Sequence, residues 1–232
     1  MLPSGAYVTL EHEYILVLRK GSKTSFYRDD AVRRRQSAFF WEERNSWFSD
    51  LWELKGVRQV LASNETRNRS AAFPFELAHR LINMYSIQGD TVLDPFLGTG
   101  TTTAACIMNA RNSIGFEMLK GFEPIIRQSI DRVGSVTNSQ IAQRLSSHVE
   151  FVESYIERRD KPLGYINKTY GFPVMTRQEV DLQFLGLESL QEATPLTFSA
   201  WHTIADNDVE QKCPVIDVKN TESAEQLVMS FG

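Results

Sequence analysis

The sequence has little cysteine, no excess of charge of one sign and no long apolar run. Its two cysteines, Cys106 and Cys213, lie far apart without a Cys or His partner at metal-ligand spacing, so neither a disulfide framework nor a zinc site is expected. No apolar stretch approaches the roughly 18 residues that a membrane span needs. Since the N-terminus also lacks the layout of a secretory signal, we expect a cytoplasmic protein without membrane contact.

Four histidines are present, without metal-ligand spacing, and are expected to be structural: His12, His79, His148 and His202. The net charge of −4 is unevenly distributed. Residues 19–70 hold 12 of the 25 Lys and Arg but only 7 of the 29 Asp and Glu. A basic segment of this kind can neutralise phosphates within an acidic protein, because salt screens charges beyond roughly 8 to 10 Å.

The order of predicted elements indicates an α/β fold. Hydrophobic periodicity and the positions of Gly and Pro predict a strand over residues 7–18 with a buried end, followed by an irregular arginine-rich and aromatic region over 22–70. A helix is then predicted to start at Pro74, followed by a short buried strand over 91–93, a helix over 101–109, a strand over 113–116 and a helix over 119–133. A tail of mixed helical and irregular pieces begins at Phe151. Alternating helices and strands predict a parallel sheet with right-handed crossovers.

A glycine loop, LDPFLGTGTT (residues 93–102), joins the first strand of that sheet to a helix. Gly98 and Gly100 would let bare backbone approach a ligand, because glycine has no Cβ. The loop has no lysine of the kind that phosphate-binding loops carry, and position 103 is threonine rather than the third glycine of dinucleotide folds. A tight turn without a ligand is the alternative.

A carboxylate, Glu117, closes the second strand 19 residues after Gly98. This spacing is close to the roughly 20 residues at which an acid reaches ribose hydroxyls in such folds. The ligand is therefore expected to carry a ribose without a pyrophosphate, and S-adenosylmethionine fits that description. A solvated strand end is the alternative for Glu117.

The stretches LDPFLGTGTT, NSIGFE and AFPFELAHRLINMYSIQGDTV resemble the amino-methylating DNA methyltransferases, which modify the exocyclic amine of adenine (N6) or cytosine (N4). The order resembles the β class, in which the catalytic half precedes the cofactor half. PSGAYVTLEHEYILVLRKG and WFSDLWELKG resemble the segments that flank the recognition region of that family, so the resemblance covers roughly residues 2–133, with FPVMTRQE (172–179) a weaker family tail.

This resemblance implies a Rossmann-like, S-adenosylmethionine-dependent methyltransferase sheet, incomplete in this chain, with an irregular target-recognition insert. The implied cofactor-binding residues are Asp94, Pro95, Phe96, Gly98, Gly100 and Thr101 for the methionine part, Glu117 for the ribose, and Phe73 and Pro74 with the following helix start for the cofactor carboxylate. Many relatives have a His-Pro pair before that helix, where this chain has residues 69–72, RSAA.

The family's catalytic tetrapeptide, Asp/Asn/Ser-Pro-Pro-Tyr/Phe/Trp, is absent, since no two of the eight prolines are adjacent. No residue is therefore assigned as catalytic, and the chain is expected to be the recognition and cofactor half of the enzyme, either a fragment or one subunit of a split enzyme. The predicted parts are residues 1–20 (end strands of the catalytic half), 21–70 (target-recognition insert), 71–150 (cofactor-binding α/β part) and 151–232 (tail of uncertain role). A half-built sheet with an exposed edge is expected to self-associate.

The arginines of the basic segment are predicted to contact double-stranded DNA: Arg33, Arg34, Arg35, Arg44 and Arg58, with Arg67 and Arg69 beyond them. Its tryptophans are expected to be structural. The leading hypothesis is thus a DNA methyltransferase of a restriction-modification system. The alternatives are a catalytically inactive DNA-binding or partner-binding fragment, and a methyltransferase acting on RNA or a small molecule.

Overall fold

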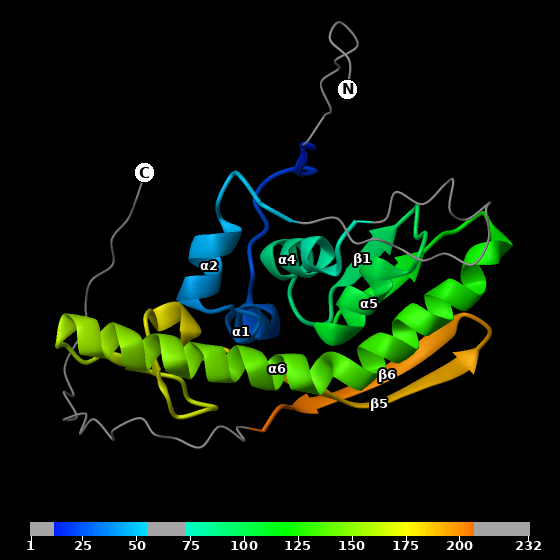
Figure 1. Cartoon of the computed structure of the whole chain (residues 1–232). Coiled ribbons are helices and arrows are strands. Elements are labelled where there is room, and N and C mark those ends of the chain that lie inside the picture. The colour runs from blue at the N-terminus through cyan, green and yellow to red at the C-terminus, as the bar shows by residue number, and fades with distance from the viewer. Residues whose placement is uncertain (1–11, 55–72, 207–232) are drawn as a thin grey trace, which may run out of the picture.

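A computed structural model of the 232-residue chain describes residues 12–54 and 73–206 (Figure 1). Helices, strands and two short 3-10 turns follow in the order α1 (Arg28–Gln36), α2 (Trp41–Trp47), α4 (Phe75–Tyr85), β1 (Thr91–Asp94), α5 (Thr101–Met108), β2 (Asn112–Gly115), η1 (Lys120–Phe122), α6 (Glu123–Arg159), β3 (Tyr165–Ile166), β4 (Pro173–Val174), η2 (Arg177–Glu179), β5 (Leu185–Thr194) and β6 (Thr197–Ile204). No helix in these two ranges combines the length and apolarity needed to cross a bilayer.

The predicted unit of helix, strand, helix and parallel strand is present. Pro74 precedes α4, as expected, and β1 pairs with β2 in parallel, with Leu93 opposite Ile114. The prediction of a buried first strand was wrong, because the helices described over residues 12–54 and 73–206 cover only one face of the pair. Val92 packs against α4 and α5, whereas Leu93 and Ile114 point to the other face and are 60% and 51% exposed.

Helix α6 is far longer than the helix predicted to end at Val133, since it continues to Arg159 and crosses the predicted boundary at residue 150. Its buried stripe keeps helical spacing throughout, but two of its positions after Val133 are polar. Thr137 donates its hydroxyl to the Val133 carbonyl (2.7 Å), and His148 is fully buried with polar partners. Because these buried positions are polar, the spacing of apolar residues alone does not indicate a helix beyond Val133.

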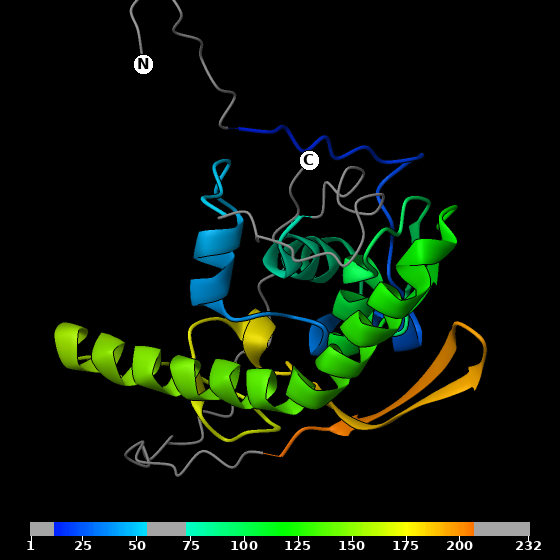
Figure 2. The same cartoon turned by 45° about the vertical axis from the view of Figure 1, so that its right-hand side comes forward.

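Helix α6 runs along the molecule (Figures 1 and 2), and two hydrophobic cores lie along it. Its first half packs against α5 and against the antiparallel hairpin β5–β6, and Nε2 of His202 in β6 also donates to the Ile107 carbonyl of α5 (2.8 Å). Its second half packs against Phe40 and the segment that carries β3 and β4, in a cluster with Phe172 and Leu182. The hairpin was not expected, because its residues lack a clean alternation of apolar and polar side chains.

The N-terminal predictions need correction. Residues 12–18 form no strand, and Tyr14, Leu16 and Leu18 are more than 80% exposed, because no strand in the described part of the chain pairs with them; residues 7–11 lie outside that part. The region 22–54 is less irregular than predicted, since it contains α1 and α2. Helix α2 is anchored by aromatic burial, with Trp47 5% exposed, which agrees with a structural role for that tryptophan.

Candidate functional site

The glycine loop connects the end of β1 to the start of α5 and takes backbone conformations that favour glycine. Gly98 and Gly100 have φ angles of +53° and +79°. The N–H of Gly100 donates to the Leu97 carbonyl (3.0 Å), which closes a tight turn, and Gly100 then caps α5. A Cβ on Gly100 would lie 3.3 Å from Cγ2 of Ile126, so both conformation and space require glycine there.

Asp94 holds the two ends of the loop together. Its Oδ1 accepts the N–H of Phe96 (2.9 Å), and its Oδ2 accepts the Thr102 hydroxyl (2.6 Å) from the first turn of α5. Both oxygens of the Asp94 carboxylate thus form hydrogen bonds that hold the loop in its observed shape. The Thr101 hydroxyl contacts the Thr99 hydroxyl at 3.1 Å.

Glu117 lies directly beside the loop. Its Oε2 accepts the N–H of Gly98 (2.9 Å), and its Oε1 accepts the N–H of Leu119 (2.8 Å). The neighbouring backbone adds a bond from the Leu97 N–H to the Phe116 carbonyl (2.8 Å). Parallel pairing of β1 with β2 explains this meeting, because the carboxyl ends of both strands lie at one edge.

The other predicted cofactor residues are divided between two places. Pro95 and Phe96 are exposed on the loop, with Phe96 88% exposed. Phe73 and Thr101 instead line a cavity of about 750 Å³ that is bounded by α2, α4, α5 and α6. Pro74 caps α4 beside Phe73, and the lining residues do not include Asp94, Gly98, Gly100 or Glu117. The structure therefore places Glu117 against the glycine loop, whereas Phe73 and the start of α4 lie at the cavity.

The cavity has a buried polar network on its α4 and α5 wall that sequence reasoning missed. Asn109 donates one amide hydrogen to the Ala105 carbonyl (2.6 Å) and contacts Nδ1 of His79 at 3.1 Å, while Asn83 donates to the Asn109 side-chain oxygen (2.9 Å). Burial, followed by the positive charges of nearby arginines, lowers the pKa of His79 to about 3. His79 is therefore neutral near pH 7 and acts as a hydrogen-bonding core residue. His79 and Asn83, four residues apart on the buried face of α4, were the available signal.

Arg111 lies at the same wall and is 7% exposed. It donates to the backbone carbonyls of Asn109 (2.5 Å) and Ser86 (2.9 Å), so its charge is solvated by the chain itself. Burial is the main cause that lowers its pKa to about 10, which leaves it protonated at neutral pH.

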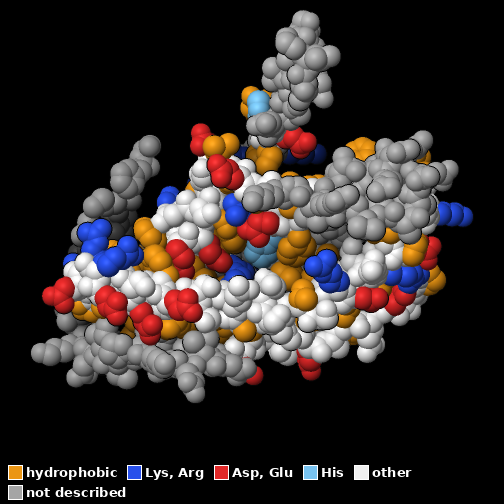
Figure 3. Space-filling view, in the orientation of Figure 1, with side chains coloured by type: hydrophobic (Ala, Val, Ile, Leu, Met, Phe, Trp, Pro, Cys, Tyr) orange, Lys and Arg blue, Asp and Glu red, His pale blue; other side chains and the backbone are white. Residues whose placement is uncertain are grey.

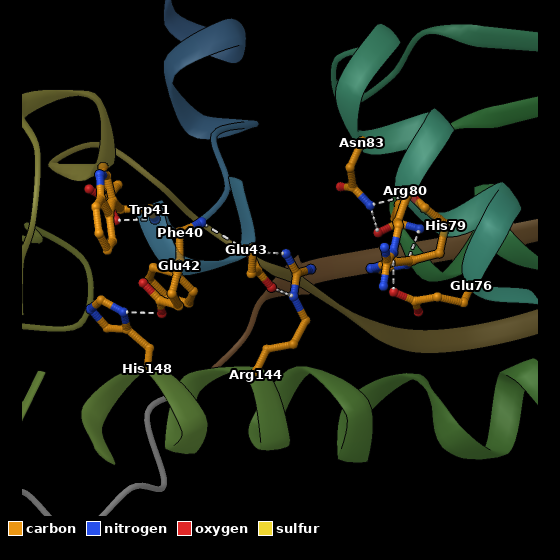
Figure 4. Close-up of polar contacts among 12 residues, drawn as sticks. Phe40, Trp41, Glu42, Glu43, Glu76, His79, Arg80, Asn83, Arg144 and His148 are labelled. Atoms are coloured by element: carbon orange, nitrogen blue, oxygen red, sulfur yellow. Dashed lines mark hydrogen bonds and ion pairs between the residues drawn. The ribbon is translucent and has the colours of Figure 1, made fainter. Parts of the chain in front are cut away.

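Two acid-base contacts attach α2 to α6 (Figure 4). Arg144 donates from Nε and from one terminal nitrogen to the two oxygens of Glu43 (2.7 and 2.9 Å), and its guanidinium lies 4.2 Å from the centre of the Phe184 ring. Nδ1 of His148 is 2.7 Å from Glu42, and its Nε2 donates to the Pro173 carbonyl (3.1 Å). Glu43 and Arg144 also line the cavity, at the end away from the glycine loop.

Four of the arginines predicted to bind DNA are exposed on two helices: Arg33, Arg34 and Arg35 on α1, and Arg44 on α2. Arg33 pairs with Asp30, and Arg35 with Asp181 (3.0 Å). Arg34 stacks over Phe26, and Arg44 over Phe48. Arg58, Arg67 and Arg69 lie outside the described residues. On the face shown in Figure 3, Lys and Arg side chains are interspersed with Asp and Glu rather than gathered in one patch.

Comparison with known proteins places these features in context. A family model described as DNA methylase matches residues 1–128. The chain is 50% identical over 185 residues to the Type II methyltransferase M.MthZI of Methanothermobacter thermautotrophicus, a match that covers 79% of this chain and 50% of that protein. It is 49% identical over 147 residues to the Type II methyltransferase M.MjaI of Methanocaldococcus jannaschii, covering 62% of this chain and 48% of that protein.

The chain thus spans about half the length of the curated relatives it matches. Among solved structures, a protein from Thermus thermophilus described as a DNA modification methylase, in complex with S-adenosyl-L-methionine, is 32% identical. That match has a TM-score of 0.46 and covers 56% of this chain and 48% of that one.

Proposed function

The chain belongs to the DNA methylase family, and from this premise we propose that it is the cofactor-binding half of a site-specific DNA methyltransferase. The proposed reaction transfers a methyl group from the sulfonium of S-adenosylmethionine to the exocyclic amine of adenine (N6) or cytosine (N4) in double-stranded DNA, and the amine loses a proton. The observation that carries the proposal is the direct contact of Glu117 with the Gly98 N–H. The names of the relatives support a role in a restriction-modification system.

The residues of the loop fit this cofactor. Each Glu117 oxygen accepts one backbone N–H and keeps capacity for another donor, such as a ribose hydroxyl. Asp94, Gly98, Gly100 and Thr101 would shape the turn beside the cofactor, in which Gly98 is half-buried and Gly100 is buried against Ile126. Pro95 and Phe96 would flank the methionine part, and Phe73, Pro74 and the free N–H groups at the start of α4 would bind its carboxylate. The cofactor supplies the electrophilic methyl group.

The sheet supports a missing complementary half. Parallel sheets are normally covered on both faces, and the face of β1–β2 opposite α4 and α5 exposes Leu93 and Ile114, paired in register. We propose that further strands and helices of a Rossmann-like sheet, carrying the catalytic tetrapeptide, cover this face and pair with β1. These would come from another part of the enzyme or from a separate subunit. Without them, self-association through the same face is expected.

The segment carrying α1 and α2 is proposed to be part of a target-recognition insert over residues 21–70. Arg34 and Arg44 are the better candidates for phosphate contact, because they stack on aromatic rings and have no carboxylate partner in the described ranges. Arg33 and Arg35 would have to exchange an acid on the protein for a DNA phosphate. Arg58 completes the proposed set from sequence alone.

Calorimetric titration with S-adenosylmethionine tests the cofactor proposal. The wild-type chain should bind saturably, and Glu117→Ala should weaken binding by at least about tenfold, since it removes an acceptor of charge-assisted hydrogen bonds. Glu188→Ala is the matched control, because Glu188 is exposed on β5, away from the loop. Absence of binding to folded wild-type protein, or equal affinity of the two variants, would contradict the proposal.

Mixing experiments test the missing half. The chain combined with the half of M.MthZI that lies outside the matched region should methylate duplex DNA, whereas neither part should do so alone. Leu93→Lys with Ile114→Lys should abolish activity of the mixture while leaving cofactor binding intact. If the mixture binds DNA but never transfers methyl, the chain is an inert binding module instead.

A further inference from the structure

The glycine loop is held from two sides, and only one of them is the expected ligand side. Glu117 contacts it through the Gly98 N–H. On the other side lies α6, where the Ser129 hydroxyl donates to the Thr99 carbonyl at 2.7 Å. Ile126, one turn earlier on α6, stands 3.3 Å from the position of a Cβ on Gly100. Both residues fall in the helix predicted over residues 119–133, but the sequence pattern predicted no contact of either with the loop.

The hydroxyl of Ser129 fixes the orientation of one peptide group. The Thr99 carbonyl and the Gly100 N–H belong to the same planar unit, so a carbonyl directed at α6 forces the N–H in the opposite direction. That N–H donates to the Leu97 carbonyl (3.0 Å) and closes the turn. Thr99 is only 6% exposed, but it lines the same cavity as Ser129, so without the serine hydroxyl its carbonyl would have to turn to another donor, such as water in the cavity. Loss of the hydroxyl would favour rotation of the peptide and a different loop shape.

We infer that Ser129, supported by Ile126, is a positioning residue for cofactor binding: it locks the Thr99–Gly100 peptide so that the loop keeps the shape that meets Glu117. The inference rests on the proposed function of the loop. It differs from a purely structural role, because the serine acts on a turn that is closed by one hydrogen bond and contains two residues of positive φ. Such a turn can change shape while α6 and its cores stay folded.

Titration of the full chain with S-adenosylmethionine tests the inference. Ser129→Ala should raise the dissociation constant by about tenfold, because the cofactor would then bind only the fraction of molecules whose loop keeps the binding shape. Ser129→Thr keeps the hydroxyl and should restore affinity to within about threefold of wild type. Ser135→Ala is the matched control, since this exposed serine of the same helix donates only to the Arg132 carbonyl. Wild-type affinity in Ser129→Ala would overturn the inference.

Amide hydrogen exchange gives a second readout that does not need the cofactor. The Gly100 N–H should exchange at least about tenfold faster in Ser129→Ala than in Ser135→Ala, while amides in the buried centre of α6 remain unchanged. If wild-type protein failed to bind S-adenosylmethionine, the proposed function would be refuted. The exchange rate of the Gly100 N–H would still test whether Ser129 holds the loop in its observed shape. Equal exchange at Gly100 in both variants, or a uniform increase along α6, would refute the lock.

Discussion

Removal of the Arg144 guanidinium should destabilise the whole chain, because it would leave Glu43 as an unpaired acid between α2 and α6. Both side chains are only 16% exposed, and two charge-assisted hydrogen bonds join them. Breaking a fully buried pair costs about 3 to 5 kcal/mol, and the remaining water contact reduces this, so Arg144→Met should lower the free energy of unfolding by about 2 to 4 kcal/mol. Contact with the Phe184 ring is lost as well.

Urea unfolding followed by circular dichroism measures this loss as a shift in midpoint at unchanged slope. Arg132→Met is the matched control, since Arg132 is exposed on the same helix and has no ion-pair partner in the described ranges. It should change stability by no more than about 0.5 kcal/mol. Arg144→Lys should fall between the two, because an ammonium cannot reproduce the planar two-point contact.

A double-mutant cycle separates the pair from the individual residues. Glu43 also accepts the Phe40 N–H (2.9 Å), and Glu43→Gln keeps an acceptor for it. The variant with both Glu43→Gln and Arg144→Met has no unpaired charge and should be more stable than the sum of the single effects predicts, with a coupling of about 1 to 3 kcal/mol. If Arg144→Met were as stable as Arg132→Met, the role of this ion pair in stabilising the attachment of α2 to α6 would be refuted.

Further predictions concern groups elsewhere in the fold. Burial lowers the pKa of His79 from 6.5 to about 3, so as the pH falls the unfolded chain binds a proton at this side chain before the folded chain does. The free energy of unfolding should therefore decrease as pH falls from about 6.5 toward 3, by up to about 1.4 kcal/mol per pH unit. Urea midpoints of His79→Gln should vary less with pH over that range. Burial raises the pKa of Cys106 to about 11, so in a Cys213→Ser background the native protein should resist Ellman's reagent at pH 8 until it is unfolded; rapid labelling would contradict this. Gly100→Ala should cost about 1 to 3 kcal/mol, since its φ is +79° and Ile126 is close, whereas Gly164→Ala, with open space around it, should change urea stability by less than about 0.5 kcal/mol; equal effects would be inconsistent with strain at the loop.

The glycine loop and Glu117 could be related from sequence because a general rule connects them. A loop after one parallel strand and an acid after the next must meet at the same edge of the sheet, and the structure places Glu117 Oε2 2.9 Å from the Gly98 nitrogen. Helix α4 was also predictable, since Pro74 and the helical spacing of apolar residues indicate its start. The roles of these residues toward a cofactor remain predictions.

Other features depended on contacts between distant segments. Residues 12–18 have the composition of a β-strand, but no strand in the described part of the chain pairs with them, so they do not form a β-strand. Helix α6 continues past Val133, and its buried His148 has polar partners in distant segments, Glu42 and the Pro173 carbonyl, which a pattern of apolar residues cannot reveal. The hairpin β5–β6 packs against α6, and its own sequence does not show the alternation of apolar and polar residues that would predict two strands.

Local chemistry in the chain was therefore sufficient for the order of helices and strands around the loop, because backbone preferences and short-range spacing act within a few residues. The three-dimensional fold decided which polar groups are buried together, such as Glu43 with Arg144, and which face of β1–β2 stays open. It also brought Ser129 of α6 to the Thr99 carbonyl, 30 residues away in sequence. Burial and pairing at such separations depend on packing of the whole chain, which no local pattern encodes.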